Sequence, residues 1–136
     1  ADTHSLHSWA SLLHNAASHA SRVGNTLDAR IMLMKAMKVW EKLLGQDHRE
    51  TLRSREMLGL VLHDERRWKE AEELQRLVLD TRKKVDRPEH ALALGSMANL
   101  ASTYRNQGQW DEAEKLEEQV METRKTKLGP DHLDTL

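Results

Sequence analysis

Residues 99–114, which read NLASTYRNQGQWDEAE, hold the pattern that decides the fold. Apolar residues before and within this stretch recur at the spacing of one helix face, until Asn106-Gln107-Gly108 interrupts them. A second helical series runs from about Trp110 to Leu128, with Glu112 in its first turn, where a carboxylate faces the positive end of the helix dipole. The stretch therefore predicts two helices joined by a short turn.

The same pattern occurs twice more, as MLGLVLHDERRWKEAE at residues 57–72 and as NAASHASRVGNTLDAR at residues 15–30, with 42 residues from each copy to the next. A spacing that many separate positions keep is the signature of an internal repeat. The positions that keep it include Ala29, Ala71 and Ala113; Leu58 and Leu100; Trp68 and Trp110; and His48, His90 and His132. We therefore expect an all-α fold of repeated helix pairs.

Neither helix of a pair can bury its apolar face alone, so successive pairs must stack into one elongated core, with small residues such as Gly59 letting helices approach closely. We expect one array over residues 1–136, with repeats at 1–44, 45–86 and 87–128. Residues 129–136 match the start of a truncated fourth repeat. Since the chain opens with Ala and ends inside that match, we expect it to be a segment of a longer protein.

Charge and composition narrow the class of protein. The 21 Lys and Arg residues nearly balance the 22 Asp and Glu residues, which gives no electrostatic reason to expect nucleic acid or an anionic membrane as partner. The chain has no cysteine, no apolar run long enough to span a bilayer and no signal-peptide pattern. We therefore expect a soluble protein of the cytoplasm.

Catalysis and cofactors have little support in the sequence. No Gly-x-x-x-x-Gly-Lys phosphate loop occurs, and the Ser, His and Asp residues follow no nucleophile–base pattern. His4, His7 and His14 lie along one side of the first helix and could be read as metal ligands, but no carboxylate or thiolate completes the set nearby. We expect no enzyme activity, no cofactor and no metal.

The stretch at 99–114 resembles the tetratricopeptide repeat signature, and the 42-residue period is similar to the kinesin-light-chain type of that repeat. The linker LGPDHLDTL at residues 128–136 matches the linker of that type, as does Leu44-Gly45-Gln46-Asp47-His48. Residues 97–136 are also similar to the C-terminal repeats of fungal NOD-like receptors, which are STAND-type ATPases. The resemblance implies a right-handed α-solenoid whose first helices line a concave groove for a peptide or protein segment.

The resemblance also assigns groove positions to the first helix of each repeat. Carried over, they are Ser11, His14, Asn15, Ser18, Ser21 and Arg22; Arg53, Glu56, Met57, Leu60, His63 and Asp64; and Gly95, Ala98, Asn99, Ser102, Arg105 and Asn106. We select Asn15, Arg22, Arg53, Met57, His63, Asn99, Ser102, Arg105 and Asn106 as partner-binding residues. An amide such as Asn15 or Asn99 can bond a ligand backbone because it both donates and accepts. Glu56 and Asp64 oppose the arginines, so the charge of the ligand stays open.

Three functions fit these expectations. The first is a ligand-sensing or assembly domain at the C-terminus of a fungal NOD-like receptor. The second is a cargo- or partner-binding adaptor of kinesin-light-chain type. The third is an architectural module that binds only copies of itself through its terminal repeats.

Some positions depart from the repeat or suggest structural roles. Ile31, Met34 and Trp40 are apolar where the other repeats carry charges, which predicts that an upstream segment or a second copy covers them; an ordinary terminal repeat with exposed apolar residues is the alternative. Trp68 and Trp110 open second helices at a packing position, so we expect them in the core. The recurring linker histidines, His48 among them, are expected to pack or to cap helices.

Overall fold

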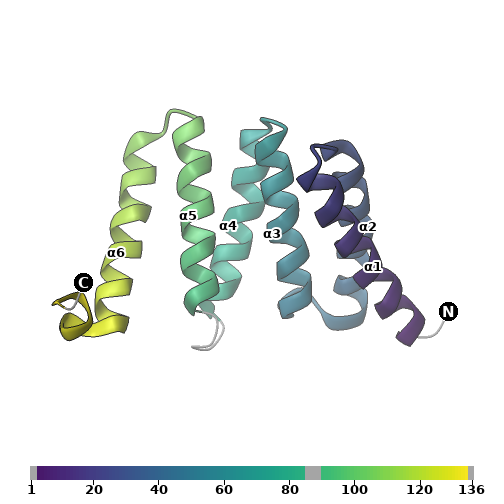
Figure 1. Ribbon diagram of the computed structural model, residues 1–136, viewed down its shortest axis with the longest axis horizontal. Coiled ribbons are helices and arrows are strands. Elements are labelled where there is room, and N and C mark those ends of the chain that lie inside the picture. The colour runs from purple at the N-terminus through teal and green to yellow at the C-terminus, as the bar shows by residue number, and fades with distance from the viewer. Residues whose placement is uncertain (1–2, 85–89, 135–136) are drawn as a thin grey trace.

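The computed structural model describes residues 3–84 and 90–134, and within these ranges the chain forms six α-helices and no strand. Side chains are described for residues 3–84 and 92–125. The helices stand in a row, with the N-terminus and the C-terminus at opposite ends of the long axis (Figure 1). Their bounds are α1 Thr3–Arg22, α2 Thr26–Leu44, α3 Arg49–Asp64, α4 Trp68–Lys84, α5 His90–Asn106 and α6 Trp110–Asp134.

Each helix packs mainly on the helices before and after it in sequence, as expected for stacked pairs. The second helices, α2 and α4, thereby join one repeat to the next. The first helices also touch one another, α1 against α3 and α3 against α5, whereas the second helices make no comparable contacts among themselves within the described residues. We call the row formed by α1, α3 and α5 the inner side, because its members contact one another. The expected helical-repeat fold is confirmed.

The turn inside each pair repeats in detail. Gly24, Arg66 and Gly108 occupy the same repeat position, and all three have a positive φ, of 84°, 63° and 79°. Glycine adopts this left-handed conformation without strain, whereas an arginine does so at a cost of about 1 kcal/mol or more. One residue later in each repeat, a backbone amide reverses the chain by bonding the carbonyl five residues earlier: Asn25 to Ala20, Arg67 to Leu62 and Gln109 to Tyr104, at 2.8–2.9 Å.

Side chains cap the starts of two helices, α2 and α3. Asn25 Oδ1 accepts a hydrogen bond from the Asp28 amide at 3.3 Å, which satisfies one of the free donors at the start of α2. His48 Nδ1 accepts one from the Glu50 amide at 3.1 Å at the start of α3, so the capping role expected of this linker histidine is confirmed. The side chains of His90 and His132 lie outside the described residues.

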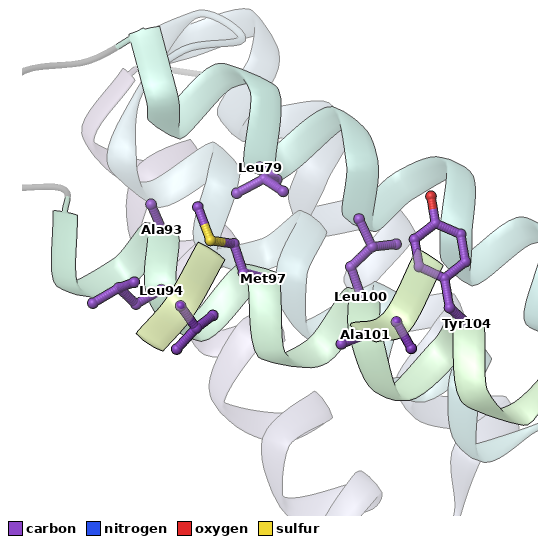
Figure 2. Packing of buried hydrophobic residues seen from close by; sticks show 9 residues of the cluster. Leu79, Ala93, Leu94, Met97, Leu100, Ala101 and Tyr104 are labelled. Carbon is purple, nitrogen blue, oxygen red and sulfur yellow. The ribbon is translucent and has the colours of Figure 1, made fainter. Parts of the chain in front are cut away.

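The core runs through the array. One cluster joins α1, α2, α3 and α4, and it includes Leu33, Leu58 and Val61. A second joins α4, α5 and α6, where Leu79 of α4 lies near Met97 of α5, and Ala93 belongs to the same cluster (Figure 2). Because both clusters cross a repeat boundary, the stacking that the sequence predicted is confirmed.

Close helix approach is confirmed at Gly59. A Cβ added to this residue of α3 would lie 3.0 Å from Cγ of Gln75 in α4. The same repeat position holds Ala17 and Ala101, both buried. The position is therefore reserved for the smallest side chains, and for glycine where the facing residue is a glutamine.

The end of α6 differs from the expectation. The helix extends to Asp134, beyond the predicted end at Leu128, and so runs through the predicted linker at Gly129-Pro130. Figure 1 shows the yellow C-terminal end of α6 turned back on itself, and Pro130 removes a helix hydrogen bond in this segment.

No described helix is apolar over a length sufficient to cross a bilayer.

Candidate functional site

The predicted partner-binding residues all lie on the first helices: Asn15 and Arg22 on α1, Arg53, Met57 and His63 on α3, and the remaining four on α5. Most of them are exposed. Met57, His63 and Asn99 are half-buried, and Met57 contacts the core cluster of the first four helices. The nine residues thus follow the inner side of the array from α1 to α5.

The structure brings three of them together. Asn106 Nδ2 lies 2.8 Å from His63 Nε2, and Ser102 Oγ lies 3.3 Å from the same nitrogen. Asn106 Nδ2 also donates to the Ser102 carbonyl at 3.0 Å. An amide nitrogen can only donate, so His63 Nε2 acts as the acceptor. We call His63, Ser102 and Asn106 the inter-repeat polar cluster, because it joins α3 to α5.

A hollow of about 560 Å³ adjoins this cluster. The start of α4 and the two residues before it line the hollow with Arg66, Arg67, Trp68, Lys69 and Glu70, and the end of α5 lines it with Asn106 and Gln107. The Trp68 ring meets the His63 ring edge to face, with centroids 4.9 Å apart. The hollow therefore combines an aromatic surface with the cations Arg66 and Lys69, with the Arg67–Glu70 ion pair and with the amide of the polar cluster.

Asn99 occupies the same repeat position as Asn15 and Met57, at the middle of the inner side. Its backbone carbonyl accepts a bond from Thr103 Oγ1 at 3.2 Å. Its side-chain amide has no hydrogen-bond partner among the described residues. A half-buried amide in that state is suited to bonding a ligand's backbone.

The arginines are partly engaged within the chain. Arg53 lies 3.5 Å from Glu50, in an exposed pair one helical turn apart. Arg105 Nε lies 3.2 Å from Glu117 Oε2 of α6, and its guanidinium stands 5.9 Å from the centre of the Trp110 ring. Hydrogen bonding to Glu117 raises the pKa of Arg105. Exposed pairs of this kind are worth under about 1 kcal/mol, so a ligand carboxylate can compete for either arginine.

Two residues carried over as groove positions prove to be structural. His14 Nδ1 lies 3.1 Å from Ser54 Oγ, and Glu56 Oε1 accepts a bond from Ser96 Oγ at 2.6 Å. Both bonds join one repeat to the next across 40 residues, at equivalent positions. The prediction that His14 and Glu56 face a ligand is therefore wrong, because His14 is buried and Ser96 and Arg82 engage both carboxylate oxygens of Glu56. The recurrence of Ser54 and Ser96 at the repeat spacing was the available sequence signal.

His14 is the most perturbed histidine of the described part of the chain. It is 4% exposed, and burial together with the charge of Arg53 lowers its pKa from the usual 6.5, against a smaller opposing effect of Glu50. The neutral ring is thus the form that fits between α1 and α3. Since the folded-state pKa lies below the unfolded one, His14 contributes stability above pH 6.5 that is lost as the pH falls below this value.

We expect the His14→Gln variant to show a weaker loss of stability between pH 7.5 and pH 5.5 than the unmodified chain, because glutamine keeps a polar group near Ser54 but does not titrate. Urea unfolding at the two pH values measures the difference. His4→Gln, which changes an exposed histidine of the same helix, serves as the control and should retain the full pH dependence. An unchanged pH dependence in His14→Gln would show that His14 has no such role.

The three residues predicted to take part in self-association differ in their exposure to solvent. Ile31 and Met34 are each 42% exposed, but Trp40 is only 1% exposed. The Trp40 ring packs with Ala10 and Ala36, and the His7 ring meets it edge to face at 4.8 Å. Trp40 is therefore covered by α1 of its own repeat and cannot form part of an open surface. That part of the prediction is wrong.

Trp110 is also not where the sequence predicted it. It is 59% exposed, with Arg105 over its ring, whereas Trp68 at the same repeat position is half-buried. Trp68 adjoins Asn106 and Gln107 of the following repeat. Trp110 belongs to the last described repeat and has no such neighbour among the described residues.

The histidines considered as metal ligands have separate surroundings. His14 bonds Ser54, His7 contacts Trp40, and His4 is exposed. In the described part of the chain, no three His, Asp or Glu side chains are grouped as a metal site would need.

Comparisons with known proteins bear on the family. Tetratricopeptide repeat models match residues 10–84 and residues 93–134. A search of curated proteins found no match. Among solved structures, BtubC (BKLC) from P. vanneervenii is similar with a TM-score of 0.83 and 17% identity, over 88% of this chain and 48% of that one. At this identity the likeness concerns the fold alone.

A second similar structure comes from Podosopora anserina and contains nearly identical TPR-like repeats of a protein named as a kinesin light chain. It has a TM-score of 0.77 and 29% identity, over 90% of this chain and 59% of that one. A substituted variant of the same protein matches with the same values. The chain thus spans about half the length of the first structure and 59% of the second.

Proposed function

This chain belongs to the tetratricopeptide repeat family, and we propose that it binds a protein or peptide segment along the inner side formed by α1, α3 and α5. Repeats of this family are non-catalytic scaffolds for protein interaction. The observation that supports the inner side as the binding surface is the inter-repeat polar cluster, which holds His63, Ser102 and Asn106 beside the Trp68 hollow.

The ligand that fits best is a segment with an acidic side chain near an apolar one. Glu56, which the sequence sets against the arginines, is bound to Arg82 at 2.7 Å and to Ser96, so its charge is compensated inside the array. Arg22 and Arg53 are exposed on the inner side, and Arg66 and Lys69 line the hollow. An acidic group would meet these cations, while Trp68 offers an aromatic face to the apolar neighbour.

We expect Asn99→Ala and Arg53→Glu each to weaken a bound peptide at least about tenfold, since a lost hydrogen bond to a ligand or a reversed charge is worth on the order of 1.4 kcal/mol. A peptide array probed with the chain identifies ligands, and fluorescence titration of the best hits gives the affinities. Lys35→Glu alters an exposed charge on α2, away from the inner side, and should leave binding unchanged. Equal affinities for all three variants would place the binding surface elsewhere.

We propose two roles for the protein as a whole, each supported by a different observation. The similarity to the Podosopora anserina repeats supports a partner-binding adaptor of kinesin-light-chain type. The resemblance of residues 97–136 to the C-terminal repeats of fungal NOD-like receptors supports the sensing domain of such a receptor, which remains our first proposal. We propose a cytoplasmic location for it. A phosphate-binding loop encoded upstream of residue 1 would favour the receptor, and coiled-coil heptads would favour the adaptor. Ile31 and Met34 remain a candidate contact for an additional segment.

A further inference from the structure

The two boundaries between repeats inside the chain show which positions of one repeat contact the next. His14 bonds Ser54 and Glu56 bonds Ser96, at one pair of equivalent positions. Arg30 Nε bonds Glu65 Oε1 at 3.0 Å, and Gln107 Nε2 bonds Glu72 Oε1 at 2.9 Å, at a second equivalent pair. The chemistry changes from boundary to boundary, but the positions do not. Each repeat therefore has a leading face and a trailing face that meet in a fixed register.

The leading face of repeat 1 is uncovered and apolar. On α1, Trp9 and Leu12 are 44% and 68% exposed, and Ala16 and His19 are exposed too; Val23, which follows the helix, is 66% exposed. In repeats 2 and 3, the equivalents of Trp9, Leu12, Ala16 and His19 are at most 6% exposed, because the preceding repeat covers them. These equivalents are Thr51 and Ala93, Ser54 and Ser96, Leu58 and Leu100, and Val61 and Thr103.

The trailing face of repeat 3 is likewise open within the described side chains. Met121 is 61% exposed, whereas its equivalents Leu79 and Met37 pack against the cores between repeats. Ala98 and Glu114 are exposed, and they are equivalent to Glu56 and Glu72, which hold the boundary between repeats 2 and 3.

We propose that the leading face of one copy stacks on the trailing face of a second copy, head to tail, in the register of the internal boundaries. In that register Met121 takes the part of Leu79 and Trp9 of the second copy takes the part of Ala93, two residues that share one buried cluster inside the chain (Figure 2). Ala98 takes the part of Glu56 and meets Leu12. Both pairs are apolar, and a methionine beside a tryptophan is a favourable contact.

Charge supports the same occupant. Helix α1 contains no Asp or Glu and ends with His19 and Arg22 in its last turn. Helix α6 carries the exposed Glu114 and Glu118, and the half-buried Glu117, which also pairs with Arg105. In the internal register, Thr103 bonds Gln75 at 2.6 Å, and the equivalent pair between copies is His19 with Glu117. An imidazole can donate to a carboxylate there, whereas two like-charged faces would repel.

One matched pair adds no stabilising contact between copies. Glu114 would meet Val23, whereas the equivalent pairs inside the chain, Arg30 with Glu65 and Glu72 with Gln107, form hydrogen bonds. The contact is therefore weaker than the boundaries inside the chain. Because the two faces differ, the contact is heterologous and does not close on itself, so copies add in an open series rather than stop at a dimer.

Sedimentation velocity of the 136-residue chain, over concentrations from about 5 to 500 µM, tests the proposal. The average sedimentation coefficient should rise steadily with concentration and pass the dimer value. Leu12→Glu and Met121→Glu should each remain monomeric over most of this range. Both residues are largely exposed, so circular dichroism should show an unchanged fold. Leu77→Glu is the control, because this residue is 45% exposed on α4 of the middle repeat and should leave association intact.

Mixing the two variants separates this arrangement from other modes of association. A Leu12→Glu copy keeps its trailing face, and a Met121→Glu copy keeps its leading face, so an equimolar mixture should form dimers of one copy each and nothing larger. Association that survives both single substitutions would overturn the proposal, as would its absence from the mixture. A chain that stays monomeric throughout would also overturn it and would leave the leading face to a different partner.

Discussion

Trp40→Ala is expected to lower the free energy of unfolding by about 3–5 kcal/mol, the range for removing a large aromatic side chain from a core. Trp40 is 1% exposed and packs with Ala10 and Ala36, whose side chains are too short to fill the space it would leave. The variant would therefore retain a cavity between α1 and α2. The edge contact of Trp40 with His7, at 4.8 Å, would also be lost.

Urea unfolding followed by circular dichroism gives the free energy, at a concentration low enough to keep the chain monomeric. Met34→Ala is the matched control, since Met34 lies in the same helix but is 42% exposed, and its replacement should cost less than about 1 kcal/mol. A loss in Trp40→Ala no larger than in Met34→Ala would contradict the burial of the indole and would restore Trp40 as an open surface residue.

The helix pairs, their turns and their order could be predicted from sequence because each rests on a local signal that occurs three times. Gly24 and Gly108 mark turns that need a positive φ, and the apolar spacing around Leu58 and Leu100 marks the buried side of the first helices. A single copy of such a pattern is ambiguous. Three copies in register are unambiguous, so the period of 42 residues is sufficient to predict the fold from sequence.

The same comparison misassigned one position. Trp40, Arg82 and Arg124 are equivalent, and two arginines at a repeat position predict a solvated surface. Arg82 is instead 2% exposed and Arg124 is exposed, so one repeat position is interior at two boundaries and open at the last described one. Residue type alone does not reveal this, because an arginine can be buried wherever a partner compensates its charge.

The candidate site was predictable only in part, for a related reason. Periodicity places His63 and Ser102 on the first helices, but whether they meet depends on how far adjacent repeats are rotated. The prediction could not distinguish the exposed Ser102 and Asn106 from the buried His14, although all three take part in bonds between repeats. Polar residues that recur 40 residues apart indicate hydrogen bonds between repeats, and a longer series of repeats would make this pattern easier to recognise.

Arg82→Ala is expected to cost about 3 kcal/mol of unfolding free energy, because removing one member of a buried ion pair leaves the other charge uncompensated. Arg82 Nη1 lies 2.7 Å from Glu56 Oε2 and 2.8 Å from Ser96 Oγ, and so ties α4 to both α3 and α5. Its side chain is 2% exposed and that of Glu56 is 22% exposed. Without the guanidinium, the Glu56 carboxylate would keep only Ser96 as a described hydrogen-bond donor.

The repeat supplies a matched control and a rescue. Arg124→Ala changes the equivalent residue of repeat 3, which is exposed, and should alter stability by less than about 0.5 kcal/mol. The double variant Glu56→Gln with Arg82→Met removes both charges, so it should lose less stability than Arg82→Ala alone, since no unpaired carboxylate remains. If Arg82→Ala and Arg124→Ala unfold at the same urea concentration, Arg82 does not hold the boundary. If the double variant is the least stable of all, the uncompensated charge is not the cause of the loss, and packing of the arginine side chain must carry it instead.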